Sequence, residues 1–147
     1  MARIVSRAVA SLLMLALMGC ETAVSDDDSG DRLTQSDWVA QAIACQPVIN
    51  PGRVTLSFGE GRVSGRSGCN LYSGPVEYGR GAITVGPVIS TKMACMEAGL
   101  MQQESTYLNA LQAAERYAVG GDGRLTIKTK MGTLVYDSAP RQMRPEG

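Results

Sequence analysis

Apolar and polar residues alternate in several short segments between residues 38 and 137. In the clearest segment, Val54, Leu56 and Phe58 fall on one face of an extended chain, as in a half-buried β-strand. Glycine, proline and asparagine lie between the segments, and these residues favour turns. The pattern predicts strands at residues 38–43, 53–58, 62–64, 74–78, 82–85, 88–93, 124–129 and 133–137.

One segment changes to helical periodicity. Leu100, Glu104, Tyr107 and Leu111 recur at helical spacing, which predicts a helix over residues 99–116. We expect its apolar face to cover the β core; the alternatives are a partner-binding groove and a helix lying on a membrane. Many short strands with one helix indicate a mainly β (α+β) fold, a small antiparallel β-barrel-like domain with one packed helix. Closing the sheet leaves no unpaired edge strand.

The N-terminus has the pattern of an export signal. Arg3 and Arg7 precede an uncharged apolar run at residues 8–18, and this run is shorter than the roughly 20 residues of a spanning helix. Residues 17–20 (LMGC) resemble a bacterial lipobox, which implies that residues 1–19 form a lipoprotein signal peptide and that Cys20 is lipidated. The alternative is an ordinary secretory signal with an incidental cysteine.

Residues 20–36 lack apolar periodicity and are rich in acidic side chains. We interpret them as a flexible acidic tether that follows the lipidated cysteine. The aspartates at 26–28 could be taken for a calcium loop, but the spaced ligands and terminal glutamate of an EF-hand are missing. Residues 139–147 are predicted to be a C-terminal tail.

Charge and composition exclude several classes of protein. The chain has 14 basic and 14 acidic residues and no histidine. It lacks the clustered basic excess of a nucleic-acid-binding protein. Without histidine, Ser-His and Cys-His nucleophilic pairs and His-containing zinc sites are impossible.

No catalytic or cofactor motif is present. The chain has no phosphate-binding loop or dinucleotide fingerprint, and its carboxylates are scattered. The sequence therefore predicts no enzyme, no cofactor and no metal. An enzyme with Lys92 or Cys45 as nucleophile is the alternative, and it would need an orienting partner beside that group. The methionines at 93, 96, 101 and 131 could suggest copper binding, but without histidine or a repeated methionine pattern core packing is the better interpretation.

Two motifs are distinctive: residues 61–74 (GRVSGRSGCNLYSG) and residues 86–95 (GPVISTKMAC). In this order, with Trp38 upstream, they resemble the META/HslJ domain family over residues 37–138. The resemblance implies an antiparallel β-barrel-like fold with a helix between the later strands, and a link to envelope stress and heat shock. The chain departs from the family pattern at Leu71 and Lys92, where arginine is common, and at Cys45, where a turn glycine is usual.

The two motifs also contain the candidate site residues. The turn around Asn70 has a sufficient structural explanation in its glycines, but loops on β scaffolds often bind ligands. If a binding site exists there, its candidate members are Asn70, Tyr72, Thr91 and Lys92.

Three cysteines besides Cys20 need a role. Cys69 and Cys95 are the best disulfide candidates in an oxidising compartment. Cys45 is then a semi-buried thiol or an alternative partner for either of them.

Together these features predict a non-catalytic envelope lipoprotein, attached to a membrane through its N-terminal lipid. We expect it on the outer membrane facing the periplasm, as a stress-related module that binds an envelope protein or protects the envelope. The alternative is a carrier that holds a small apolar ligand in the barrel interior.

Overall fold

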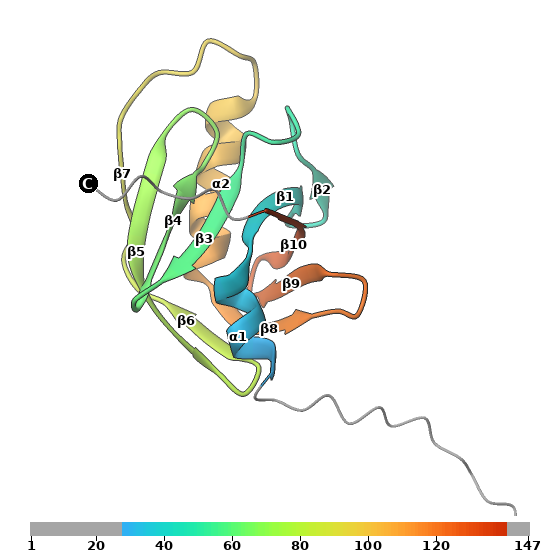
Figure 1. Ribbon diagram of the computed structural model, residues 1–147. Helices are drawn as coiled ribbons and strands as arrows, with labels where there is room; N and C mark the ends of the chain where they lie inside the picture. The colour runs from blue at the N-terminus through green and yellow to red at the C-terminus, as the bar shows by residue number, and fades with distance from the viewer. Residues whose placement is uncertain (1–27, 141–147) are drawn as a thin grey trace, which may run out of the picture.

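The computed structural model describes residues 28–140. Eight antiparallel strands form a closed barrel, as the sequence predicts (Figure 1). In their order around the barrel they are β1 (Asp37–Ile43), β3 (Thr55–Gly59), β4 (Arg62–Arg66), β5 (Leu71–Gly79), β6 (Ala82–Val85), β8 (Ala114–Val119), β9 (Arg124–Thr129) and β10 (Gly132–Ala139), and β10 pairs with β1. Two shorter strands, β2 (Gln46–Pro47) and β7 (Ile89–Ser90), pair with β1 and β5.

The strands follow the predicted alternation of buried and exposed residues. Leu56 and Phe58 of β3 are buried, and the residues beside them are half-buried. The same period of two places one set of side chains from every barrel strand in the interior. The largest fully buried side chains include Trp38, Phe58, Leu56, Tyr107, Tyr136 and Ile127.

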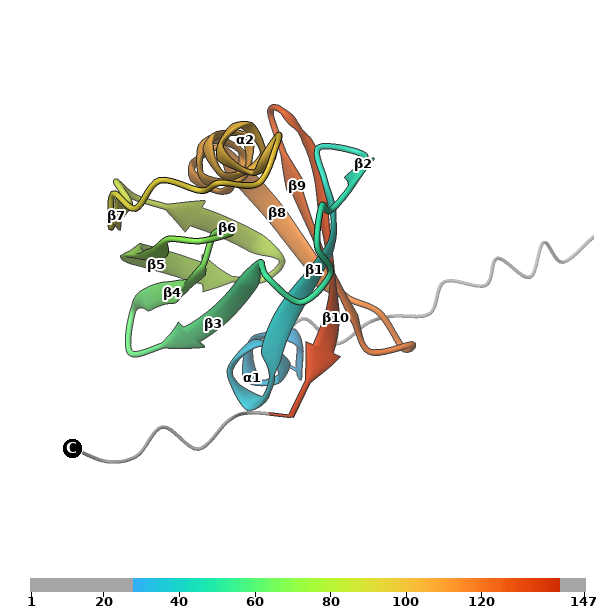
Figure 2. The same ribbon diagram turned by 90° about the horizontal axis from the view of Figure 1, so that it is seen from above.

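The barrel has one weak seam, between β6 and β8. Only Ala82 and Arg116 are in register there, and the backbone N–H of Tyr117 donates to the carbonyl oxygen of Gly81 at 2.9 Å. Figure 2 shows the helix α2 (Leu100–Gln112) end-on between strands β5–β7 and strands β8–β9. The helix therefore covers the core where strand pairing is poorest.

A short helix, α1 (Asp28–Gln35), occupies part of the segment predicted to be a flexible tether, so that prediction is wrong for residues 28–35. Leu33 is fully buried, and the Trp38 indole N–H donates to its carbonyl oxygen at 3.0 Å. Arg32 donates to the carbonyl oxygen of Gly120 at 2.8 Å. Tertiary contacts thus fix a segment whose own sequence has no periodicity. The predicted signal peptide (residues 1–19) and residues 20–27 of the predicted tether, which include Cys20, lie outside the described residues.

Other boundaries also differ from the prediction. The predicted helix 99–116 ends at Gln112, and its last residues belong to β8, where Tyr117 and Val119 point inward. The predicted strand 88–93 is reduced to β7, because Asn70 binds the backbone of the following segment. At the C-terminus β10 continues to Ala139, and residues 141–147 lie outside the described part.

No helix within residues 28–140 is long and apolar enough to cross a bilayer.

Candidate functional site

The turn at residues 67–70 connects β4 to β5. Ser67 donates both its backbone N–H and its hydroxyl to the carbonyl oxygen of Asn70, at 2.9 and 3.1 Å. Gly68 has a φ of 153°, and a Cβ there would lie 3.4 Å from the side chains of Glu104 and Leu100. The distance is that of an ordinary contact, so it is the positive φ that favours glycine at this position beside α2.

The side chain of Asn70 joins this turn to two other segments. It is 1% exposed. Its Nδ2 donates to the carbonyl oxygen of Met93 at 3.1 Å and to Oε1 of Glu104 at 2.6 Å. Its Oδ1 accepts from the Thr91 hydroxyl at 2.8 Å and from the Met93 N–H at 2.7 Å. Both donors and both lone pairs of the amide are used, so Asn70 fixes the loop after β7 and leaves no polar atom for a ligand.

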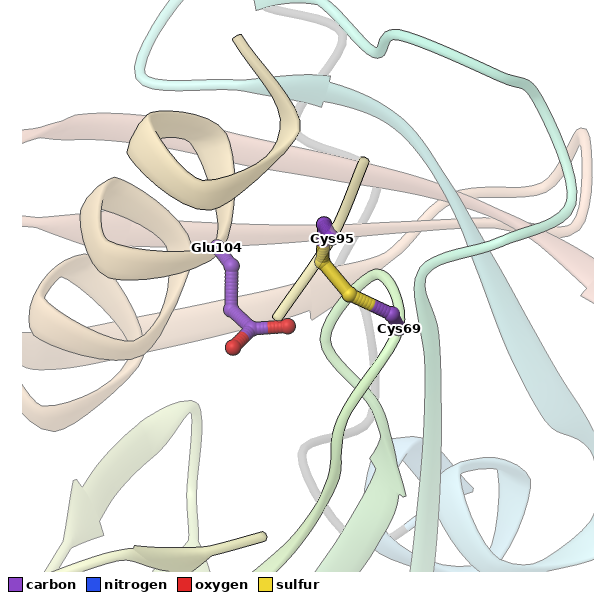
Figure 3. A group of neighbouring side chains, drawn as sticks. All are labelled: Cys69, Cys95 and Glu104. Carbon is purple, nitrogen blue, oxygen red and sulfur yellow. A yellow bond between two sulfur atoms is a disulfide. The ribbon is translucent and has the colours of Figure 1, made fainter. Parts of the chain in front are cut away.

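A disulfide and a buried carboxylate lie beside Asn70. Cys69 and Cys95 are bonded, with their Cα atoms 6.1 Å apart, so the turn at 67–70 is tied covalently to the loop at 91–99. Figure 3 shows the carboxylate of Glu104 extending from α2 toward this disulfide. Glu104 is 6% exposed, and its Oε2 accepts from the backbone N–H of Asn70 at 3.2 Å. A carboxylate oxygen of Glu104 and the sulfurs of Cys69 and Cys95 all lie within 4.8 Å of one another.

Three tyrosine hydroxyls form a chain inside the barrel. Tyr72 donates to the carbonyl oxygen of Thr55 at 2.8 Å, so the 2.7 Å contact between Tyr72 and Tyr107 has Tyr107 as donor. Tyr136 donates to Tyr107 at 3.3 Å. Burial, followed by the nearby tyrosines, raises the pKa of all three phenols well above the ordinary value. These groups stay protonated and serve as structural hydrogen bonds.

An open groove of about 330 Å³ follows the paired strands β5 and β7. Its lining residues are Leu71, Tyr72, Ser73, Ile89, Ser90 and Thr91. Two of its side chains are apolar and open to solvent: Leu71 is 55% exposed and Ile89 is 71% exposed. Arg66 is directly opposite Leu71 in the β4–β5 register, so a positive charge borders the groove.

The four predicted binding residues do not form one exposed group. Asn70 and Tyr72 are buried, whereas Thr91 and Lys92 lie on the surface. The Thr91 hydroxyl also accepts from the backbone N–H of Leu71 at 3.1 Å. Among the described residues, Lys92 is the only one of the four whose side chain has no hydrogen-bond or ionic partner. Of the four, only Thr91 and Lys92 are therefore exposed on this surface.

Cys45 lies apart from the disulfide, as an exposed free thiol in the turn between β1 and β2. It has a φ of 66°, which explains why a turn glycine suits this position. Within residues 28–140 neither the Cys45 thiol nor the Lys92 amine has a hydrogen-bonded or ionic side-chain partner that could activate it as a nucleophile.

Sequence reasoning missed two parts of the site. Glu104 was placed on the apolar face of a helix, and a carboxylate in that position already indicates a buried polar contact. Leu71 and Ile89 could not be recognised as exposed apolar residues, because strand residues alternate between faces and the register was unknown.

A small closed antiparallel barrel with one helix packed over its seam, and a disulfide joining two neighbouring loops, defines the class of fold. The META domain family matches residues 31–141, and the chain belongs to this family. It is 28% identical over 133 residues to the heat shock protein HslJ of Escherichia coli (strain K12). The aligned region covers 86% of this chain and 91% of that protein.

Two solved structures share the fold. The NMR structure of a protein from Burkholderia xenovorans has a TM-score of 0.63 and 31% sequence identity, and the match covers 76% of this chain and 86% of that one. A second NMR structure has a TM-score of 0.60 and 28% identity, covering 73% of this chain and 92% of the other.

Proposed function

We propose that this chain is a membrane-anchored lipoprotein of the cell envelope whose barrel is a non-catalytic, stress-related protein-binding module. The observation that carries the binding role is the exposed apolar groove beside β5 and β7. Similarity to a protein named as a heat shock protein supports the link to stress. The export pattern and lipobox ending at Cys20 support an anchor on the outer membrane facing the periplasm.

The groove has the properties of a small protein-binding surface. Its apolar side chains project from a β5–β7 pair that Asn70 and the Cys69–Cys95 disulfide hold in place. A preorganised apolar surface loses little conformational entropy when a partner binds. Arg66 and Lys92 next to it favour a partner that carries acidic residues around an apolar one.

The barrel interior favours this proposal over a ligand carrier. Trp38, Tyr107 and Tyr136 are almost completely buried, and the hydroxyls of the two tyrosines are bonded to each other across the interior. An apolar ligand in the same space would have to displace these rings and break their hydrogen bonds.

Cross-linking in intact cells tests the binding role. The tagged lipoprotein, with Cys20 kept, is cross-linked and recovered, and its partners are compared with those of Ile89→Asp and Leu71→Asp. The control is Met131→Asp, because Met131 is 47% exposed but lies in the turn between β9 and β10. One envelope protein that is recovered with the unchanged chain and the control, and lost with both groove variants, supports the proposal. Identical recovery with all four chains contradicts it.

The anchor needs a separate experiment. Cys20→Ala removes the thiol that would carry the lipid, so we expect the variant to lose lipid labelling and to leave the outer-membrane fraction. Equal labelling and equal membrane association of both chains would contradict lipid attachment at this residue.

A further inference from the structure

We infer that the reduced Cys69–Cys95 pair, together with Glu104, forms a binding site for one Zn²⁺ ion, and that the disulfide closes this site. The inference concerns a different set of atoms from the groove at Leu71 and Ile89. It therefore stands or falls independently of the proposed protein-binding role.

The three candidate ligands come from three separate segments. Cys69 is in the turn before β5, Cys95 is in the loop at 91–99, and Glu104 is on α2. Figure 3 shows the carboxylate and the two sulfurs directed toward one another, and their ligand atoms all lie within 4.8 Å. Zinc–sulfur bonds of about 2.3 Å and zinc–oxygen bonds of about 2.0–2.2 Å place tetrahedral ligand atoms roughly 3.5 Å apart. Opening the disulfide and moving the ligands slightly is enough to reach this arrangement.

The surroundings of Glu104 favour a cation. The carboxylate is 6% exposed, yet within residues 28–140 its hydrogen-bond partners are only the side-chain amide and the backbone N–H of Asn70. No lysine or arginine of the described part forms an ion pair with it. A buried carboxylate is costly without a compensating positive charge, and a bound zinc ion would supply one.

Asn70 would orient the carboxylate ligand. Its amide N–H and backbone N–H donate to the two carboxylate oxygens at 2.6 and 3.2 Å, and each oxygen has a further lone pair for a metal. Hydrogen bonds of this kind to a ligating carboxylate hold it in position and contribute to metal affinity. Cys95 is only half-buried, so a water molecule can reach the fourth position.

The switch between the two forms is a balanced thiol–disulfide exchange. A dithiol reductant gives two electrons and two protons to the Cys69–Cys95 bond, which breaks into two thiols while the reductant becomes a disulfide. Zinc binding releases the two thiol protons, because the ligands are thiolates. Exchange with an oxidised dithiol reverses the electron transfer: the two thiolates become the protein disulfide, the oxidised dithiol takes up the two electrons, with two protons from water, and the metal is released.

The ligand set favours zinc over other thiol-binding ions. Two thiolates and a carboxylate oxygen around a tetrahedral centre suit Zn²⁺, which accepts both sulfur and oxygen. Monovalent copper selects soft sulfur ligands and gains little from a carboxylate.

Metal titration of the full chain in detergent tests the inference. Cys20 and Cys45 are changed to serine so that only Cys69 and Cys95 supply thiols after reduction. The protein is reduced with a phosphine, which is removed, and Co²⁺ is added as a spectroscopic probe before competition with Zn²⁺. The oxidised protein is titrated in parallel. Glu104→Gln tests the carboxylate, and Glu97→Gln is the matched control, because Glu97 is an exposed carboxylate in the loop at 91–99 that carries Cys95.

We expect the reduced protein to bind one ion with a sulfur-to-cobalt charge-transfer band that Zn²⁺ removes, and the oxidised protein to show no such band. Glu104→Gln should weaken zinc binding by about tenfold or more, in the range seen when groups around a metal site are removed, and Glu97→Gln should leave it unchanged. Equal binding by reduced and oxidised protein would overturn the inference. Equal zinc affinity of the reduced protein and its Glu104→Gln variant would also overturn the inference, because the carboxylate would then not be a ligand.

Discussion

At the scale of single residues, Asn70 holds together segments 23 and 34 positions away in the chain. Asn70→Ala removes the four hydrogen bonds of the side chain and leaves the buried Glu104 carboxylate with only the backbone N–H of residue 70 as a partner. We expect the free energy of unfolding to fall by about 3 kcal/mol, measured by urea denaturation. Asn109→Ala is the control, because Asn109 is exposed on the same helix that carries Glu104, and it should change stability by less than about 0.5 kcal/mol. Equal effects of the two substitutions would contradict the role given to Asn70.

The buried tyrosines predict how stability depends on pH. Burial raises the pKa of Tyr72, Tyr107 and Tyr136 in the folded chain, whereas the same phenols in the unfolded chain ionise near their ordinary pKa. Below about pH 10 both states hold these protons, so the three groups add no pH dependence. Above it the unfolded chain loses protons first, and stability falls by about 1.4 kcal/mol per pH unit for each tyrosine.

Comparing Tyr136→Phe with the unchanged chain isolates this effect from other alkaline titrations. The Tyr136 hydroxyl donates to Tyr107 and accepts no hydrogen bond from Tyr72 or Tyr107. Its replacement therefore removes one titrating group and leaves the hydrogen bond between Tyr107 and Tyr72 in place. We expect urea denaturation at several pH values between about 10 and 11.5 to give a shallower slope for the variant, by about 1.4 kcal/mol per unit. Parallel slopes would show that Tyr136 does not keep its proton in the folded state.

At the scale of elements, α1 is attached to the barrel through Leu33. The side chain is fully buried and its carbonyl oxygen accepts the Trp38 indole N–H. Leu33→Ala should therefore lower the free energy of unfolding by about 2–4 kcal/mol, through lost burial and the cavity left behind. Gln35→Ala, at an exposed position of the same helix, should have little effect. An equally small effect of Leu33→Ala would mean that α1 adds nothing to the core.

The success of sequence reasoning also differed between elements. Strands β3, β6 and β9 were predicted well, because an alternating pattern records one buried face in the local sequence. The sequence does not predict helix α1, because part of what holds it, the carbonyl oxygen of Gly120 after β8, is 88 residues away from Arg32 in the chain. The first residues of β8, 114–116, fall within the predicted helix because Ala114 and its neighbours fit either period in so short a segment.

The candidate site is also predictable only in part. The two motifs identify its residues but do not show which of them face solvent. Asn70 was placed among the binding candidates because its residue type suits both a ligand contact and a turn. The tertiary structure shows that Leu71 and Ile89 are exposed, whereas Asn70 is buried against Glu104 of α2.

At the scale of the whole molecule, the barrel should open at the β6–β8 seam before any other pair of strands. That seam has one residue pair in register, whereas β9 and β10 are paired from Gly132 with Thr129 to Asp137 with Arg124. In native-state hydrogen exchange we expect the Tyr117 amide, which bonds across the seam, to exchange on the order of tenfold or more faster than amides bonded between β9 and β10. Helix α2 covers the seam, so a substitution that loosens it, such as Leu111→Ala at a fully buried position, should widen this difference. If all these amides exchange at one rate in both proteins, the barrel opens only as a single cooperative unit, and α2 stabilises every strand alike.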